Sequence, residues 1–99
     1  MLNIKNKVEG TKTTISLEGR LDTTTAPQFE QEVKNALAGV TELVLDLEKL
    51  DYVSSAGLRV FLSVQKLMKS QGTMKVTHVN EDVYEIFEVT GFSEILTIE

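Results

Sequence analysis

Residues 42–47, with the sequence ELVLDL, leave this chain few possible folds. The segment is short, apolar and rich in β-forming side chains, which is typical of a strand covered on both faces. Amphipathic helical patterns flank it, one around Phe29 and Val33 and the other over residues 58–68. Strands that alternate with helices favour right-handed crossovers and a mostly parallel sheet. We therefore expect an α/β fold with residues 42–47 as its central strand.

The rest of the chain supplies further strands and helices. Polar and apolar residues alternate over residues 2–8 and 13–18, which predicts two strands joined near Gly10 as a hairpin, with the first strand antiparallel at an edge. A strand at 74–79, a helix that Asn80 caps and a last strand at 95–98 complete the order β-β-α-β-α-β-α-β. The expected architecture is a mixed, mostly parallel sheet of about five strands with three main helices.

Cap residues predict where the helices begin and end. Thr25 and Gln28 have the spacing of a capping box, in which a hydroxyl and an amide satisfy each other's backbone donors. Pro27 suits the first turn of the helix that starts there. Glycines are predicted to end the three helices: Gly39, Gly72 and Gly91.

Length and charge narrow the class of protein. With 99 residues, 41% of them hydrophobic, residues 1–99 are expected to form a single domain with one core. The 15 acidic side chains outnumber the 10 basic ones, which argues against binding to a nucleic-acid backbone. The chain has no cysteine for disulfides or thiolate zinc sites, and no stretch is typical of a signal peptide or a membrane span. We expect a cytoplasmic protein that binds neither membranes nor nucleic acid.

The segment LDYVSSAGLRVFL, residues 50–62, places Ser54 and Ser55 between an extended region and the start of a helix. In a parallel sheet, ligands and partners meet the loops at the carboxyl ends of the strands. Three roles are open to these serines: a helix cap, a nucleophile, or a phosphate acceptor whose added charge suits a helix N-terminus. A nucleophile needs a base, and the single histidine, His78, has no carboxylate partner nearby in sequence. The spacing of His78 and the carboxylates predicts no metal site.

Three charged residues near the same strand ends are further candidates. Asp22 either organises its own turn or faces a partner. Asp46 ends the apolar strand, and we expect it to turn towards the loop and accept hydrogen bonds from loop amides. Arg59, in the first turn of the second helix, is either solvated or in contact with a kinase or a phosphate.

The whole chain resembles the STAS domain of bacterial anti-sigma factor antagonists. LEGRLD, residues 17–22, resembles a strand-end motif of that family, and VTGFSEIL, residues 89–96, resembles its closing segment. The more specific match is LVLDLEKLDYVSSAGL, residues 43–58, which is similar to the family's central strand and phosphorylation loop.

This resemblance implies that Ser55 is the phosphate acceptor, because the family's acceptor position is counted back from Gly57 and Leu58. Ser54 stands where several relatives carry aspartate, and Ala56 stands where many carry serine or threonine. The missing carboxylate changes the local charge and leaves Ser54 as a second hydroxyl beside the acceptor.

What the resemblance implies for function is partner switching rather than enzymatic activity. In this family, the unphosphorylated antagonist binds an anti-sigma factor, often a serine kinase, and thereby frees a sigma factor. The kinase then phosphorylates the loop serine, the antagonist is released, and a PP2C-type phosphatase restores it. The resemblance implies no cofactor, and we expect a monomer. The expected phosphorylation site is Ser55, and the expected partner-facing residues are Asp22, Thr23, Thr24, Ser54, Ala56, Gly57 and Arg59. The alternative is an accessory STAS subunit of a transporter or signalling complex, in which Ser55 is never phosphorylated.

Overall fold

The computed structural model describes residues 2–99 and contains one four-stranded mixed sheet. The strands lie in chain order across the sheet: β1 (Leu2–Glu9), β2 (Lys12–Leu21), β3 (Glu42–Val53) and β4 (Thr73–Thr77). β1 pairs antiparallel with β2, whereas β2, β3 and β4 run parallel. The predicted hairpin, the antiparallel edge strand and the central position of residues 42–47 are therefore confirmed.

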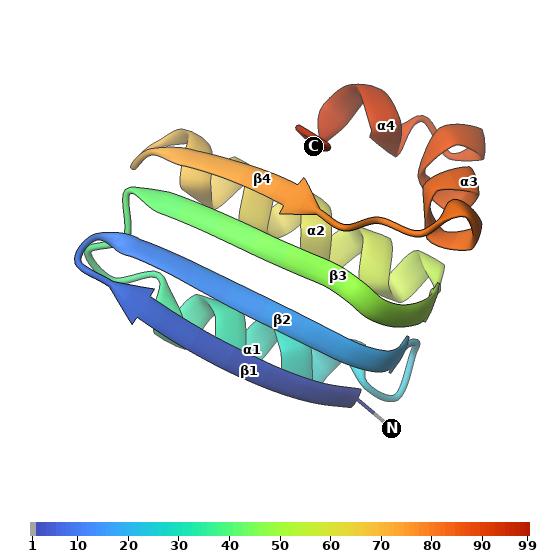
Figure 1. The fold of residues 1–99 in the computed structure, drawn as a ribbon, viewed down its shortest axis with the longest axis horizontal. Coiled ribbons are helices and arrows are strands. Elements are labelled where there is room, and N and C mark those ends of the chain that lie inside the picture. Colours follow the sequence, from blue (N-terminus) through green and yellow to red (C-terminus); the bar gives the residue numbers. More distant parts are fainter. Residues whose placement is uncertain (1) are drawn as a thin grey trace.

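Helices follow the last three strands and complete the α/β architecture. They are α1 (Ala26–Ala36), α2 (Ser55–Lys69), α3 (Glu81–Val89) and the short α4 (Phe92–Ile95). Figure 1 shows α1 and α2 next to each other on one face of the sheet, with α3 and α4 beyond the end of β4. Among residues 2–99, no helix is long and apolar enough to cross a bilayer.

The predicted fifth strand is the main difference from the expected fold. Gly91 adopts a left-handed backbone, with φ of 83°, and the chain then turns into α4, which includes Ile95, the first residue of the expected strand at 95–98. The chain reaches β4 again only at its end, where Val76 and Ile98 form a single parallel bridge. The number of strands predicted was thus one too many, because Ile95 belongs to α4 and the residues after it form only this isolated bridge.

β3 is central, but helices cover only one of its faces. Leu43, Leu45 and Leu47 are fully buried against the helices, whereas Asp46 on the other face is partly exposed. Figure 1 shows that this other face carries no helix. The expectation of a strand covered on both faces was wrong: Val44 is buried there because it lies between Thr14 and Lys75 of the neighbouring strands.

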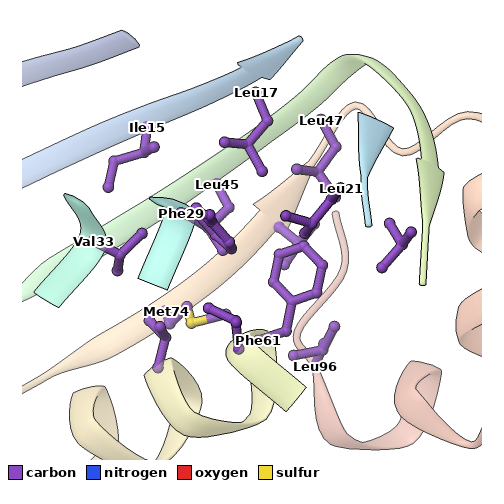
Figure 2. Close-up of a cluster of buried hydrophobic side chains, with 14 of the residues drawn as sticks. Ile15, Leu17, Leu21, Phe29, Val33, Leu45, Leu47, Phe61, Met74 and Leu96 are labelled. Atoms are coloured by element: carbon purple, nitrogen blue, oxygen red, sulfur yellow. The ribbon is translucent and has the colours of Figure 1, made fainter. Parts of the chain in front are cut away.

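Three phenylalanines join the helices in the core. Phe61 of α2 packs edge-on against Phe29 of α1 and Phe87 of α3, with ring centroids 5.6 and 5.7 Å apart. All three are fully buried, and Figure 2 shows Phe29 and Phe61 among leucine side chains from β2 and β3. This cluster holds α2, and with it the serine pair, on the sheet.

Two predicted helix caps have different outcomes. Asn80 caps α3 as predicted: its Oδ1 accepts from the amide of Val83 at 2.9 Å, and its Nδ2 donates to the carbonyl of Leu50 at 2.7 Å. The capping box of Thr25 and Gln28 does not form, because the Thr25 hydroxyl donates to the carbonyl of Arg20 instead. Pro27 does lie in the first turn of α1.

Candidate functional site

The candidate site lies where β2 and β3 end beside the start of α2. Leu21 and Val53 are register partners at these strand ends, and the amide of Ser54 donates to the carbonyl of Leu21 at 2.8 Å. β3 continues to Val53, so Ser54 alone connects the strand to α2. The serine pair is therefore held on a short, hydrogen-bonded connection between two regular elements.

Ser54 is the N-cap of α2. It has an extended backbone, with φ of −89° and ψ of 174°, and its Oγ accepts a hydrogen bond from the amide of Gly57 at 3.3 Å. Its side chain is half-buried. The capping role that was open to both serines therefore belongs to Ser54.

Ser55 is the first residue of α2 and has a different environment. It is exposed, and its hydroxyl has no hydrogen-bond partner within residues 2–99. The hydroxyl therefore lies at the helix N-terminus, where it forms no hydrogen bond within the described part of the fold and is accessible to another protein.

Removal of each hydroxyl should separate the two roles. Ser54→Ala is expected to lower the free energy of unfolding by about 1 kcal/mol, because the amide of Gly57 loses its acceptor. Ser55→Ala is expected to change it by less than about 0.5 kcal/mol, because no contact is lost. Urea denaturation followed by circular dichroism measures both, and a larger loss for Ser55→Ala would mean that the roles are reversed.

Asp22 organises the turn between β2 and α1. Its Oδ1 accepts from the Thr24 hydroxyl at 2.7 Å and from the amides of Thr24 and Thr25 at 3.0 and 3.2 Å. The Thr24 hydroxyl, helped by these amides, lowers the pKa of Asp22 below its ordinary value of 3.8, although partial burial acts in the opposite direction. Asp22 thus remains a carboxylate at the edge of the site, and its turn-forming role is confirmed.

Loss of the Thr24 hydroxyl should raise the pKa of Asp22 towards its ordinary value. Because the pKa is lower in the folded protein, the turn stabilises the fold above about pH 4, and this contribution is lost as the pH falls through the lowered pKa. In Thr24→Ala the contribution is smaller and is lost at a higher pH. NMR titration of the Asp22 carboxyl carbon measures the shift. The control is Thr23→Ala, because the Thr23 side chain makes no hydrogen bond within residues 2–99; an equal shift in the control would contradict the assignment.

Sequence reasoning took Thr25 for a helix cap and missed that its side chain ties the Asp22 turn to β2. Its buried hydroxyl donates to the carbonyl of Arg20 at 2.8 Å and accepts from the amide of Asp22 at 2.9 Å. Arg20 also lies over the ring of Tyr52, its register partner on β3, at 4.5 Å from the ring centre. The run of three threonines was the available signal, but nothing local distinguishes the buried one from its exposed neighbours.

A shallow hollow adjoins the serine pair between α1 and α2. It has a volume of about 260 Å³, and its lining residues are Thr23, Ala26, Pro27, Glu30, Ala56, Arg59 and Val60. Among the predicted partner-facing residues, the structure therefore brings Thr23, Ala56 and Arg59 to one hollow.

Gly57 is buried and acts through packing. A Cβ atom at this position would lie 2.7 Å from Cγ of Leu21 and 3.1 Å from Cγ1 of Val53, so only glycine allows α2 to approach the strand ends this closely. Gly57 therefore fixes how closely the first turn of α2, with Ser55, packs against the sheet. Because Gly57 is buried, little of it is accessible to a partner.

His78 lies next to a carboxylate that is distant from it in the sequence. Its Nδ1 lies 3.1 Å from Oδ1 of Asp46, because β3 and β4 are in register there. Asp46 also accepts from the amide of Glu48 at 3.1 Å, so its predicted bonds to the serine loop are not formed. Asp46 lies seven positions before Val53 along β3, or roughly 23 Å away. His78 and Asp46 therefore cannot activate Ser55, which forms no Ser-His-Asp arrangement with them.

The described residues also show no metal centre. Within residues 2–99, no group of three or more histidine, cysteine or acidic side chains is placed to hold an ion. The chemistry that remains at this site is that of an exposed hydroxyl beside a fixed carboxylate and a free guanidinium.

Comparison with known proteins agrees with this geometry. The family model described as STAS domain matches residues 3–99. The chain therefore belongs to the STAS domain family.

Its relatives include proteins named for anti-sigma factor antagonism. BtrV of Bordetella bronchiseptica, described as a candidate anti-sigma factor antagonist, is 39% identical over 84 residues, which span 83% of this chain and 72% of BtrV. The anti-sigma-B factor antagonist of Bacillus subtilis is 26% identical over 98 residues, covering 98% of this chain and 90% of that protein.

Solved structures share the fold at lower identity. An anti-sigma factor antagonist from Mycobacterium paratuberculosis superposes with a TM-score of 0.90 at 19% identity, covering 99% of this chain and 85% of that one. The unphosphorylated form of the antagonist SpoIIAA gives 0.82 at 19% identity, covering 100% and 88%. The phosphorylated form of SpoIIAA, from Bacillus, gives 0.74 at 18% identity, covering 100% and 91%.

Proposed function

We propose that this protein is an anti-sigma factor antagonist that is switched off by phosphorylation of Ser55. In its unmodified state the protein binds an anti-sigma factor that is also a serine kinase. The anti-sigma factor then releases the sigma factor that it held. The observation that carries this proposal is the division of labour between the serines: Ser54 caps α2, which leaves the Ser55 hydroxyl exposed and unbonded. The names of the relatives support the antagonist part of this role.

Phosphate transfer at Ser55 requires no rearrangement of the fold. The Ser55 Oγ attacks the γ-phosphorus of ATP in the kinase, the bond to ADP breaks, and the hydroxyl proton passes to a base of the kinase. The product adds roughly −1.5 to −2 charges at the N-terminus of α2, where free amides and the helix dipole favour an anion. The antagonist therefore stays folded while its docking surface changes charge.

The added charge explains release of the partner. The protein already carries a formal net charge of −5, and Asp22 holds a carboxylate at the edge of the site. A phosphate there is opposed by any acidic or apolar surface docked over the serine pair, and like charges across an interface cost several kcal/mol. A PP2C-type phosphatase then restores the binding form. In this role the protein is a cytoplasmic regulator and a kinase substrate, and it is not itself an enzyme.

Affinity capture from a lysate of the source cells tests the switch. The baits are the wild-type protein, Ser55→Asp, Ser55→Ala and the matched control Ser54→Asp, and mass spectrometry identifies the proteins that each retains. We expect the wild type and Ser55→Ala to retain a kinase-like anti-sigma factor. Ser55→Asp should bind it about tenfold or more weakly when the purified pair is titrated.

The other outcomes decide against the switch. If all baits retain the same transporter or complex subunits, Ser55 carries no regulatory charge and the accessory-subunit role replaces the proposal. If Ser54→Asp abolishes binding and Ser55→Asp does not, the acceptor position is wrong. Thermal unfolding of each bait shows whether a loss of binding merely reflects a loss of fold.

A further inference from the structure

Arg59 lies one helical turn beyond Ser55 on the exposed face of α2. Both residues are exposed, whereas Gly57 and Leu58 between them are buried. Residues four apart in a helix have Cβ atoms about 5–6 Å from each other, within reach of a long guanidinium side chain. Arg59 is therefore placed to meet any group attached to the Ser55 oxygen.

The guanidinium of Arg59 also has no acidic partner within residues 2–99. The acidic residue that shares its hollow, Glu30, is bound elsewhere, because its Oε2 accepts from Lys34 Nζ at 3.0 Å. A charged donor next to an exposed hydroxyl, with no counter-ion of its own, is a ready partner for an anion formed on that hydroxyl.

We infer that Arg59 is the internal counter-ion of phosphorylated Ser55, so that one modification changes two features of the docking surface. The inference rests on the proposed function, since it takes Ser55 as the phosphate acceptor. The order of charges along the helix is the favourable one, with the anion four residues N-terminal to the cation. The planar guanidinium can donate two parallel hydrogen bonds to phosphate oxygens, which an ammonium cannot do.

The consequence for the partner is larger than the phosphate alone would produce. Before modification, the surface offers the positive charge of Arg59 to an acidic group of the partner. After modification, the guanidinium turns to the phosphate and is withdrawn from the partner, while the net local charge becomes negative. Phosphorylation thus removes the attraction between Arg59 and the partner and adds a repulsion from the phosphate, so the two effects together weaken binding more than either would alone.

The test uses protein with phosphoserine incorporated at position 55 during translation, so that no kinase or partner is needed. Phosphorus NMR titration gives the pH midpoint of the second phosphate ionisation. We expect this midpoint to lie about 0.4 pH unit lower with Arg59 than in Arg59→Ala, and the difference to shrink in 1 M salt. Arg59→Lys should give an intermediate midpoint because the lysine charge remains without the guanidinium geometry.

The matched control is Lys69→Ala, which removes one positive charge from the other end of α2, roughly 21 Å from Ser55 along the helix. It should leave the midpoint unchanged, since screening removes so distant an interaction. Equal midpoints for the wild type and Arg59→Ala would overturn the inference, as would an equal shift in Lys69→Ala. Neither result touches partner switching, which the capture experiment tests separately.

Discussion

Phe61→Ala is expected to lower the free energy of unfolding by about 4 kcal/mol, because it removes a fully buried ring at the point where three helices meet. The change deletes both edge-on aromatic contacts, to Phe29 and to Phe87, and leaves a cavity under α2. A domain of this size has only about 5–15 kcal/mol of stability in total, so the variant should lose a large fraction of its stability.

Urea denaturation followed by circular dichroism measures the loss from Phe61→Ala. If that variant does not fold, Phe61→Leu keeps most of the volume and should cost about 1 to 1.5 kcal/mol. The control is Tyr84→Ala on α3, which removes an aromatic side chain that is 41% exposed and should cost less than about 1 kcal/mol. Similar losses at Phe61 and Tyr84 would show that the three-ring cluster does not hold the helices together.

Gly72→Ala should lower the free energy of unfolding by about 3 kcal/mol or more, because the turn between α2 and β4 has no room for a side chain. A Cβ atom on Gly72 would lie 1.9 Å from the carbonyl oxygen of Thr41. That oxygen accepts from the amide of Thr73 at 2.9 Å, so the backbone cannot move aside without breaking the first bond between β3 and β4.

Gly39→Ala provides the control for this close approach. Gly39 has φ of +76° and open space where a Cβ would lie, so alanine there meets only the strain of a left-handed backbone, about 1 kcal/mol. Chemical denaturation of both variants, compared with the wild type, separates steric overlap from backbone strain. The close approach would be refuted by equal losses at the two glycines.

Three structural anchors support the proposed switch at Ser55, because they hold the start of α2 in place. Phe61 holds α2 on the sheet, Gly57 allows its first turn to pack closely against Leu21, and Ser54 caps it. Ser55 therefore stands on a rigid base, and a phosphate there changes the charge of the surface rather than its shape. The same rigidity keeps Arg59 at a constant separation from Ser55.

Much of the site could be predicted because it depends on local patterns. The apolar period of α2 and the adjoining strand placed the serine pair at a helix start, as the structure confirms. The acceptor role of Ser55 is what the resemblance implies, and it stays a prediction. Sequence could not separate the roles of Ser54 and Ser55, since both are suited to capping. The difference between them lies in which hydroxyl reaches the amide of Gly57, and that depends on the backbone angles at the end of β3.

By itself, the sequence determined the order of strands and helices as far as α3, the antiparallel edge strand and the position of the central strand, because these follow from side-chain periodicity over a few residues. The tertiary structure alone decided the contacts between distant segments. Asp46 meets His78 across 32 residues because β3 and β4 are in register, and α1 and α2 enclose the hollow beside Arg59. The closing segment forms α4 and a single bridge rather than a strand. Such outcomes depend on strand register and on the space left between packed elements, which no local pattern of residues records.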